Sequence, residues 1–150
     1  MEESQEKPRV NYGRRNKVKG NNAERLYAKL FREVGFSKCI TAREGSRLYD
    51  DCAVDLIFLP ILVQIKAGKQ KAMNTSKVLM DMRDRIADRF PEDAPEQTMP
   101  KVIIHHKDRE VKGSQVRTEY DQLVTMTVDT FLIFLKAYKN DLQNSKGKNP

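Results

Sequence analysis

The sequence predicts a mixed α/β domain in which helices flank a central mixed β-sheet, in the order αβββαββα. Two observations carry this expectation. Apolar residues recur at helical spacing near residues 23–35, 74–90 and 129–142, and short apolar runs of strand length lie between these segments. At 150 residues and 39% hydrophobic content, the chain is long enough for one compact core and short for two. We therefore expect a single domain over residues 21–143.

The first predicted helix begins after Asn22, a good N-cap, and ends before Gly35, which suits a C-terminal stop. Between these two positions the apolar residues recur at helical spacing: Leu26, Tyr27, Leu30, Phe31 and Val34. We expect a short strand over 39–42 to follow, and then a polar loop over 44–51. Apolar stripes at helical spacing, here and later in the chain, are expected to belong to the core.

Two central strands are predicted over 53–59 and 61–67, where the apolar runs are broken only by Pro60. Each run is apolar on both faces, so we expect this hairpin to be buried on both faces. The next helix is capped near Asn74 and extends to about Phe90, with aspartate and arginine on its outer side.

The remaining chain is predicted to contain strands over 102–105 and 123–128, separated by a charged loop over 108–119. A last helix follows, capped by Asp129. Its apolar residues are Phe131, Leu132, Phe134, Leu135, Tyr138 and Leu142. The polar segment over 144–150 is expected to be a disordered tail.

The charge of the chain favours a polyanionic partner. Lysine and arginine total 28 against 21 aspartate and glutamate, a formal net charge of +7, which favours nucleic acid over an anionic membrane surface. Residues 1–20 are basic and nearly free of apolar side chains, so we expect a flexible arm, whose alternative role is that of a solubilising tail. The residues expected to contact phosphate are Arg14, Arg15, Lys17 and Lys19, with Arg47 from the polar loop.

The two cysteines, Cys39 and Cys52, suit a reduced intracellular protein better than a disulfide scaffold. The acidic N-terminus does not resemble a signal peptide, and no apolar run approaches the roughly 18 residues of a membrane span. We therefore expect a cytoplasmic protein with no membrane partner.

The chemically informative feature is a set of polar residues inside the two predicted central strands. Asp55 interrupts the first, while Gln64 and Lys66 stand at i and i+2 in the second and so project from one face. A tight turn between Pro60 and Ile61 would place Asp55 opposite Lys66, with all three polar groups on that face. The pair lacks the glycine or asparagine of a preferred two-residue turn, so the register stays open, although a four-residue loop about the same centre gives the same result.

A buried carboxylate or ammonium is costly unless it pairs with an opposite charge or meets a metal. The first alternative is therefore a buried salt bridge between Asp55 and Lys66. The second is a metal site, in which Asp55 and Gln64 supply the hard oxygen ligands that Mg²⁺ accepts and Lys66 holds or activates a water beside them. Because phosphodiester hydrolysis requires this combination, we favour the second. Asp50 and Asp51 could add charge near the metal, or form a solvated turn.

Glu24 is the fourth member of the candidate site. It shares a helical stripe with Tyr27 and Phe31, so it is expected to lean toward the core. Taken alone, a glutamate in the first turn of a helix is more often a favourable partner of the helix dipole. Its position relative to the strand residues favours a role in the site.

The same residues carry a family resemblance. Five stretches occur in this order: Lys19-Gly20-Asn21-Asn22-Ala23-Glu24-Arg25, Val34-Gly35-Phe36, Ala42-Arg43-Glu44-Gly45-Ser46, Val54-Asp55-Leu56-Ile57 and Val63-Gln64-Ile65-Lys66. Over about residues 13–90 this series resembles the archaeal and phage Holliday junction resolvases, which belong to the PD-(D/E)XK nuclease superfamily. The resemblance implies a restriction-endonuclease-like core.

The resemblance also implies a site and an activity. Glu24, Asp55, Gln64 and the backbone carbonyl of Ile65 would bind one or two Mg²⁺ ions, for which Mn²⁺ can substitute. Lys66 would be the catalytic lysine, and Ser46 would contact the scissile phosphate. The implied protein is an intracellular homodimer, encoded by a cell or a phage, that nicks opposed strands of four-way DNA junctions in recombination and repair.

The chain departs from the family pattern in two places. Gln64 stands where the usual residue is glutamate, which is charged and a stronger metal ligand, and Cys52-Ala53-Val54 replaces the proline of the motif name. Two other functions therefore stay open: a sequence-specific endonuclease of homing, restriction or transposon type, and a non-catalytic DNA-binding protein on the same fold. We do not expect zinc at His105 and His106, because adjacent strand residues point to opposite faces.

Overall fold

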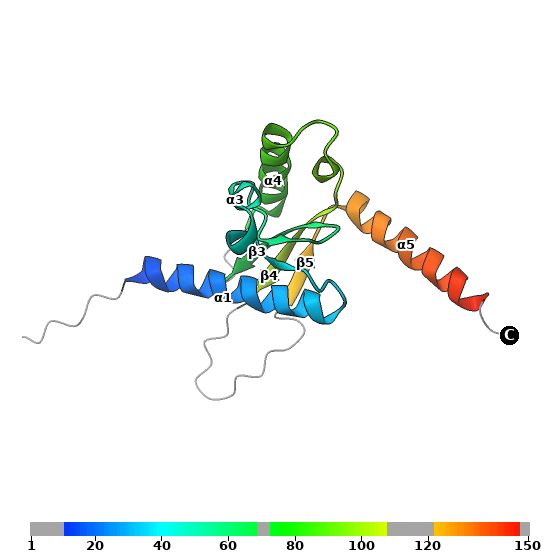
Figure 1. Cartoon of the computed structure of the whole chain (residues 1–150), viewed down its shortest axis with the longest axis horizontal. Helices are drawn as coiled ribbons and strands as arrows, with labels where there is room; N and C mark the ends of the chain where they lie inside the picture. The colour runs from blue at the N-terminus through cyan, green and yellow to red at the C-terminus, as the bar shows by residue number, and fades with distance from the viewer. Residues whose placement is uncertain (1–10, 69–72, 108–121, 148–150) are drawn as a thin grey trace, which may run out of the picture.

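The computed structural model describes residues 11–68, 73–107 and 122–147, which form a five-stranded mixed sheet and its helices (Figure 1). The strands lie in chain order across the sheet: β1 (Ile40–Thr41), β2 (Leu56–Ile57), β3 (Leu62–Ala67), β4 (Lys101–His106) and β5 (Gln122–Thr125). The helices are α1 (Tyr12–Glu33), α2 (Ala42–Gly45), α3 (Arg47–Asp51), α4 (Thr75–Arg89), the 3₁₀ helix η1 (Pro95–Gln97) and α5 (Val128–Lys146). The predicted mixed α/β class is confirmed.

The sheet has helices on both faces, with α1 on one and α4 on the other (Figure 1). β3 and β4 are parallel and joined through α4, whereas the other neighbouring strands are antiparallel. Alternate residues of β3 serve the two faces: Val63 and Ile65 pack with Tyr27 of α1, while Leu62 packs with Met82 of α4. β3 is thus covered on both sides, as its apolar sequence predicts.

The first helix is longer than its apolar stripe predicts. It begins at Tyr12, and its N-cap is Asn11, whose side chain accepts a hydrogen bond from Arg14 N at 3.1 Å, so Asn22 is not the cap. None of residues 12–22 is buried. They nevertheless continue the helix, because most of these residue types are tolerated on a solvent-exposed helix. Its end is as predicted, with Gly35 at φ +115° directly after the C-cap Val34. Residues 1–10 of the predicted arm lie outside the described residues.

The hairpin around Pro60 differs from its prediction. β2 holds only Leu56–Ile57, because Ala53 and Phe58 adopt positive φ values of 60° and 62° that interrupt the extended backbone on either side. Leu56 pairs with Val63, two positions away from the predicted partner. Asp55 is therefore not opposite Lys66 but beside Gln64. A shift of two residues leaves the faces of the strand unchanged, since side chains alternate with period two.

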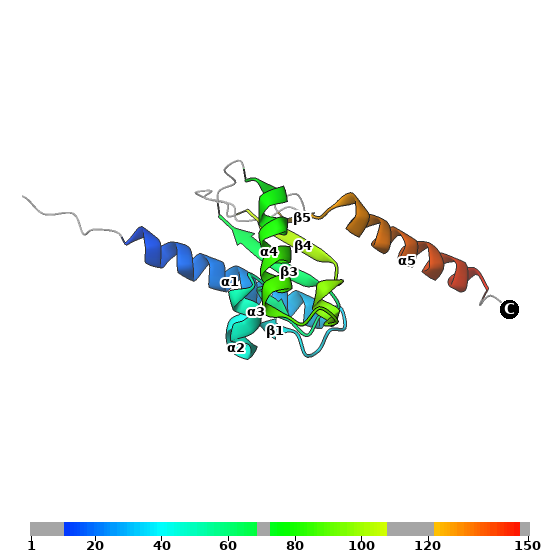
Figure 2. The ribbon, with the colours of Figure 1, turned by 90° about the horizontal axis from the view of Figure 1, so that it is seen from above.

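The C-terminal elements depart from the prediction in position and in burial. β5 ends at Thr125, and Thr127 rather than Asp129 caps α5, which extends to Lys146 and so includes the start of the predicted tail. No residue of α5 is buried, so its apolar stripe is not part of the core (Figures 1 and 2). The predicted loop over 108–119 lies outside the described residues. Within the described part of the chain, no helix is both long and apolar enough to cross a bilayer.

Candidate active site

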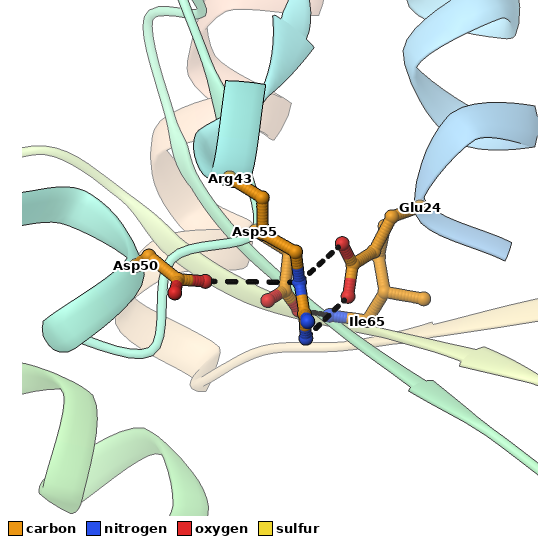
Figure 3. A network of polar contacts seen from close by, with 5 residues as sticks. All are labelled: Glu24, Arg43, Asp50, Asp55 and Ile65. Carbon is orange, nitrogen blue, oxygen red and sulfur yellow. Dashed lines mark hydrogen bonds and ion pairs between the residues drawn. The ribbon is translucent and has the colours of Figure 1, made fainter. Parts of the chain in front are cut away.

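Glu24, Asp55 and Ile65 come together at the sheet, beside Arg43 and Asp50 (Figure 3). Each arrives from a different element: α1 carries Glu24, α2 carries Arg43, α3 carries Asp50, Asp55 precedes β2, and Ile65 lies in β3. The short helices α2 and α3, where the sequence predicts only a loop, bring Arg43 and Asp50 to this point.

Glu24 is a buried carboxylate held by one arginine. Its side chain is 7% exposed, and Arg43 approaches it with Nε 3.2 Å from Oε2 and Nη2 3.4 Å from Oε1. Arg43 Nε also lies 3.9 Å from Asp50 Oδ1. Burial raises the pKa of Glu24, although the charge of Arg43 opposes this shift. The sequence-based expectation that Glu24 leans toward the core is confirmed.

Asp55 is hydrogen-bonded to the backbone of β3 on the side of β2. Its backbone N donates to Val63 O at 2.8 Å, and its Oδ2 accepts a hydrogen bond from Ile65 N at 2.6 Å. Burial raises the pKa of Asp55 from 3.8 to about 7, with a further contribution from the negative charge of Glu24, while the Ile65 amide pulls in the other direction. One amide hydrogen bond thus does not offset the cost of holding this charge away from water.

The edge of β3 also presents a backbone carbonyl toward Asp55. Leu62 N and Gly68 N donate toward β4, to Pro100 O and His106 O, so the backbone groups of the odd-numbered residues point the other way. Because the N–H and C=O of one residue project to the same edge of an extended strand, the Ile65 carbonyl points to the side from which Asp55 approaches.

Gln64 and Lys66 project from the same face of β3, as their spacing predicts. Gln64 Oε1 is buried and has no hydrogen-bond partner within the described structure. Lys66 is close enough to Asp55 for its charge to lower the pKa of that carboxyl, yet the two side chains form no ion pair in the described part of the chain. The alternative of a buried Asp55–Lys66 salt bridge is therefore not what the structure shows.

The two histidines face opposite sides of β4, in agreement with the prediction. His105 lies beside Lys66 in the parallel register, and its Nε2 is 2.9 Å from Thr125 Oγ1. His106 Nδ1 is instead 3.0 Å from the Tyr27 hydroxyl on the α1 face. Burial lowers the pKa of His105, which favours a neutral imidazole beside Lys66.

The comparisons give no family. No protein-family model matches the chain, and neither curated proteins nor solved structures include a significant match. The site is therefore interpreted from its own geometry and chemistry.

The remaining predicted residues lie outside this cluster. Ser46 is the N-cap of α3, where its Oγ accepts a hydrogen bond from Tyr49 N at 3.5 Å. Arg47 follows it, with a side chain 93% exposed. The exposed basic residues of the first turns of α1 are Arg14, Arg15, Lys17 and Lys19.

Arg43 is the residue that the sequence interpretation missed. It lies within the quoted stretch Ala42–Ser46, but an arginine between a predicted strand and a predicted polar loop carries no signal of its position among carboxylates. The sequence suggests two roles for Asp50, as extra negative charge near a metal or as part of a solvated turn. In the structure its carboxylate lies near the Arg43 guanidinium instead. The arginine supplies positive charge where buried carboxylates need it.

The oxygen atoms near β3 are of the type that a hard cation binds. The buried carboxylate of Glu24, the half-buried carboxylate of Asp55 and the Ile65 carbonyl lie near β3, and the unpartnered amide oxygen of Gln64 projects from the same strand; Mg²⁺ prefers such oxygen ligands while keeping several waters. Among the described residues, no three His, Cys, Asp or Glu side chains form a metal-binding group. A cation here would therefore depend on Gln64 and on the Ile65 carbonyl as well as on Asp55 and Glu24.

Proposed function

We propose that this chain is a magnesium-dependent DNA endonuclease with a restriction-endonuclease-like core. The observation that carries the proposal is the Asp55 carboxylate, whose pKa is about 7 because it is buried with too little positive charge around it. It lies beside Gln64, whose buried amide oxygen has no partner in the described structure, and near Lys66. Perturbed groups gathered in this way are typical of functional sites.

Each residue has a chemical role in this proposal. Asp55, Glu24, Gln64 and the Ile65 carbonyl would hold Mg²⁺, which when bound supplies Lewis-acid activation of a phosphate oxygen and of a water. Lys66, which projects beside Gln64, would position the attacking water or stabilise the charge that develops on the phosphate. The neutral imidazole of His105, next to Lys66, adds no second positive charge to this face.

A four-way DNA junction is the substrate that we favour. The support is the sequence resemblance to junction resolvases and the net charge of +7. The exposed basic turns of α1 lie ahead of Glu24 on the same helix, so cations and candidate site share one element. Phosphate contacts of this kind position a protein on DNA without reading bases, which suits selection by shape. Two nicks in opposed strands would require two active sites, and hence a homodimer.

A non-catalytic DNA-binding protein is the second candidate, and one observation favours it. Arg43 already neutralises Glu24, and Gln64 is a weaker metal ligand than the glutamate of the family pattern. Arg43 would then balance the charge of Glu24 at all times, and no metal would be needed. In that case the only role of Asp55 would be to accept the hydrogen bond from the Ile65 backbone amide of β3.

The test is a cleavage assay with purified protein and Mg²⁺, given a synthetic four-way junction and a linear duplex of the same sequences. We expect nicking of the junction by the wild type, and no nicking by Asp55→Asn or Lys66→Ala, both of which should still bind DNA. Lys107→Ala, which replaces an exposed lysine just after β4, serves as the control for lost charge. Metal-dependent nicking that survives in Asp55→Asn would refute the site, no nicking by any protein would favour the non-catalytic candidate, and cutting of one particular linear sequence would favour a sequence-specific nuclease.

A further inference from the structure

The last helix exposes an apolar stripe as large as the largest apolar patches of typical monomers, which are often functional. One stripe of α5 carries six large apolar side chains between 45% and 72% exposed: Val128, Phe131, Leu132, Leu135, Tyr138 and Leu142. At roughly 100 Å² for each half-exposed side chain, this stripe presents on the order of 600 Å² of apolar surface. Lys136, Lys139 and Lys146 border a hollow of about 650 Å³ along it. A surface of this kind is typical of an interface.

Local hydrogen bonds fix the residue at which α5 begins, directly after a residue packed on the core. Thr127 Oγ1 accepts a hydrogen bond from Thr130 N at 3.1 Å, and Phe131 N donates to Thr127 O at 3.0 Å. Met126 is packed against the α1-face core just before this cap. Both views show α5 leading away from the sheet (Figures 1 and 2). No residue of α5 belongs to either core cluster of the described chain.

The part of the chain that the structure describes also contains a groove that no described residue fills. It lies between α1 and the β5 side of the sheet and has a volume of about 280 Å³. Its apolar lining comes from α1 and its C-cap (Tyr27, Leu30, Phe31 and Val34) and from Ile104 and Val124 of the sheet. Val34 is 73% exposed and Val124 54%, although neither is polar. The groove is therefore a second apolar surface that the described residues leave uncovered.

We propose that α5 of one copy docks into the α1/β5 groove of a second copy, and that the second copy returns the same contact, giving a two-fold exchanged dimer. A pair of α5 helices alone would bury only the stripe itself, on the order of 600 Å² from each copy, which is less than the roughly 800 Å² per partner of a standard interface. Stripe and groove together let each copy bury roughly 800 Å², the size of a standard interface. Reciprocal exchange of one element is a low-cost route to a dimer.

The proposal concerns the dimer interface and not the chemistry of the site: a dimer with another interface would overturn it and leave the proposed function standing, whereas a monomeric wild type would also count against nicking of opposed strands. The measurement is the molar mass of the full-length protein in solution across a concentration series. The wild type should be a dimer. Leu135→Asp should weaken dimerisation by about 100-fold or more, because a two-fold dimer carries the substitution twice and each buried carboxylate is unpaired. Ile133→Asp is the matched control, since it makes the same kind of change on the opposite side of α5 and should leave the dimer intact.

A groove variant separates exchange from direct pairing of two α5 helices. Val34→Asp should weaken the dimer as Leu135→Asp does, and a mixture of these two chains should recover a heterodimer with one intact helix–groove contact. A Val34→Asp protein that dimerises like the wild type would overturn the proposal in favour of α5–α5 pairing. A wild type that is monomeric would also overturn the proposal. In that case α5 would either dock into the groove of its own chain or bind vesicles of anionic lipid. Helical content measured by circular dichroism would show that each variant is folded.

Discussion

Replacing Asp55 by asparagine should stabilise the metal-free protein at alkaline pH and change its stability little near pH 4. The pKa of Asp55 is raised from 3.8 to about 7 by burial, so between these pH values the folded state holds a proton that the unfolded state has lost. The free energy of unfolding therefore falls as the pH rises through this window, and the cost is fully present above about pH 7. Asparagine keeps an acceptor for Ile65 N–H and carries no charge.

The magnitude follows from the size of the shift. A difference of roughly three pKa units corresponds to about 4 kcal/mol, which is an upper figure because the unfolded reference state is not fully solvated. We expect a gain of roughly 2–4 kcal/mol at pH 8, or roughly 5–15 °C in Tm for a chain of this size. Since burial also raises the pKa of Glu24, the informative quantity is the difference between variant and wild type at each pH, which reports Asp55 together with its coupling to Glu24.

Urea unfolding followed by circular dichroism at pH 4, 6 and 8, without divalent metal, measures this difference. Asp51→Asn replaces an exposed carboxylate near the end of α3 and should change the free energy of unfolding at pH 8 by no more than about 0.5 kcal/mol. A difference between Asp55→Asn and wild type that stays constant from pH 4 to pH 8 would refute the argument from burial.

Added Mg²⁺ extends the same experiment to the proposed ligand. At pH 8 a bound cation should stabilise the wild type by about 2.7 kcal/mol when its concentration is 100 times its Kd, because it binds only the folded state. Asp55→Asn should respond much less, since it lacks the charge that the cation would neutralise. Equal responses of the two proteins would exclude Asp55 as a principal metal ligand.

Three further predictions concern the neighbouring residues. Gln64→Glu should keep nuclease activity and tighten Mg²⁺ binding in calorimetric titration, because it restores a charged ligand of nearly the same size; a folded but inactive variant would show that Gln64 has another role. Arg43→Gln should destabilise the metal-free protein by about 1–3 kcal/mol, because Glu24 stays buried without its cation, and unfolding with and without Mg²⁺ should show that the metal restores part of the loss. Removing residues 1–18, or replacing Arg14, Arg15 and Lys17 by glutamine in the intact helix, should reduce the slope of log affinity for the junction against log salt by up to about 0.9 per lost phosphate contact; unchanged slopes would identify this segment as a solubilising tail.

Local signals in the sequence determined where several elements stop and start. Gly35 ends α1 and Asn74 caps α4, where its Oδ1 accepts from Lys77 N at 3.0 Å. The apolar run of β3 predicted a strand covered on both faces, and the i, i+2 spacing of Gln64 and Lys66 put them on one face. These predictions succeed because caps and side-chain alternation depend on residues close together in the chain.

Contacts between distant residues could not be obtained in this way. The pairing of Leu56 with Val63 depends on positive φ at Phe58, which a bulky residue adopts only when tertiary contacts hold it there. The position of Arg43 on Glu24 depends on two short helices that are too brief to show a periodic pattern. The start of α1 was also missed, because Asn11 and Asn22 are equally good caps and the apolar stripe begins only after the second.

The sequence by itself thus determined the class of fold, the basic character of the chain and the residue types from which a metal site could be made. Only the tertiary structure decided how those residues meet: that Asp55 lies on the Ile65 amide, that Gln64 Oε1 is left without a partner in the described structure, and that the stripe of α5 faces solvent. The physical reason is the same in each case. An apolar stripe looks the same in the sequence whichever surface it packs against, because the hydrophobic effect is non-directional. The electrostatic cost of a carboxylate depends on the charges and solvent around it in the folded protein, which the sequence does not specify.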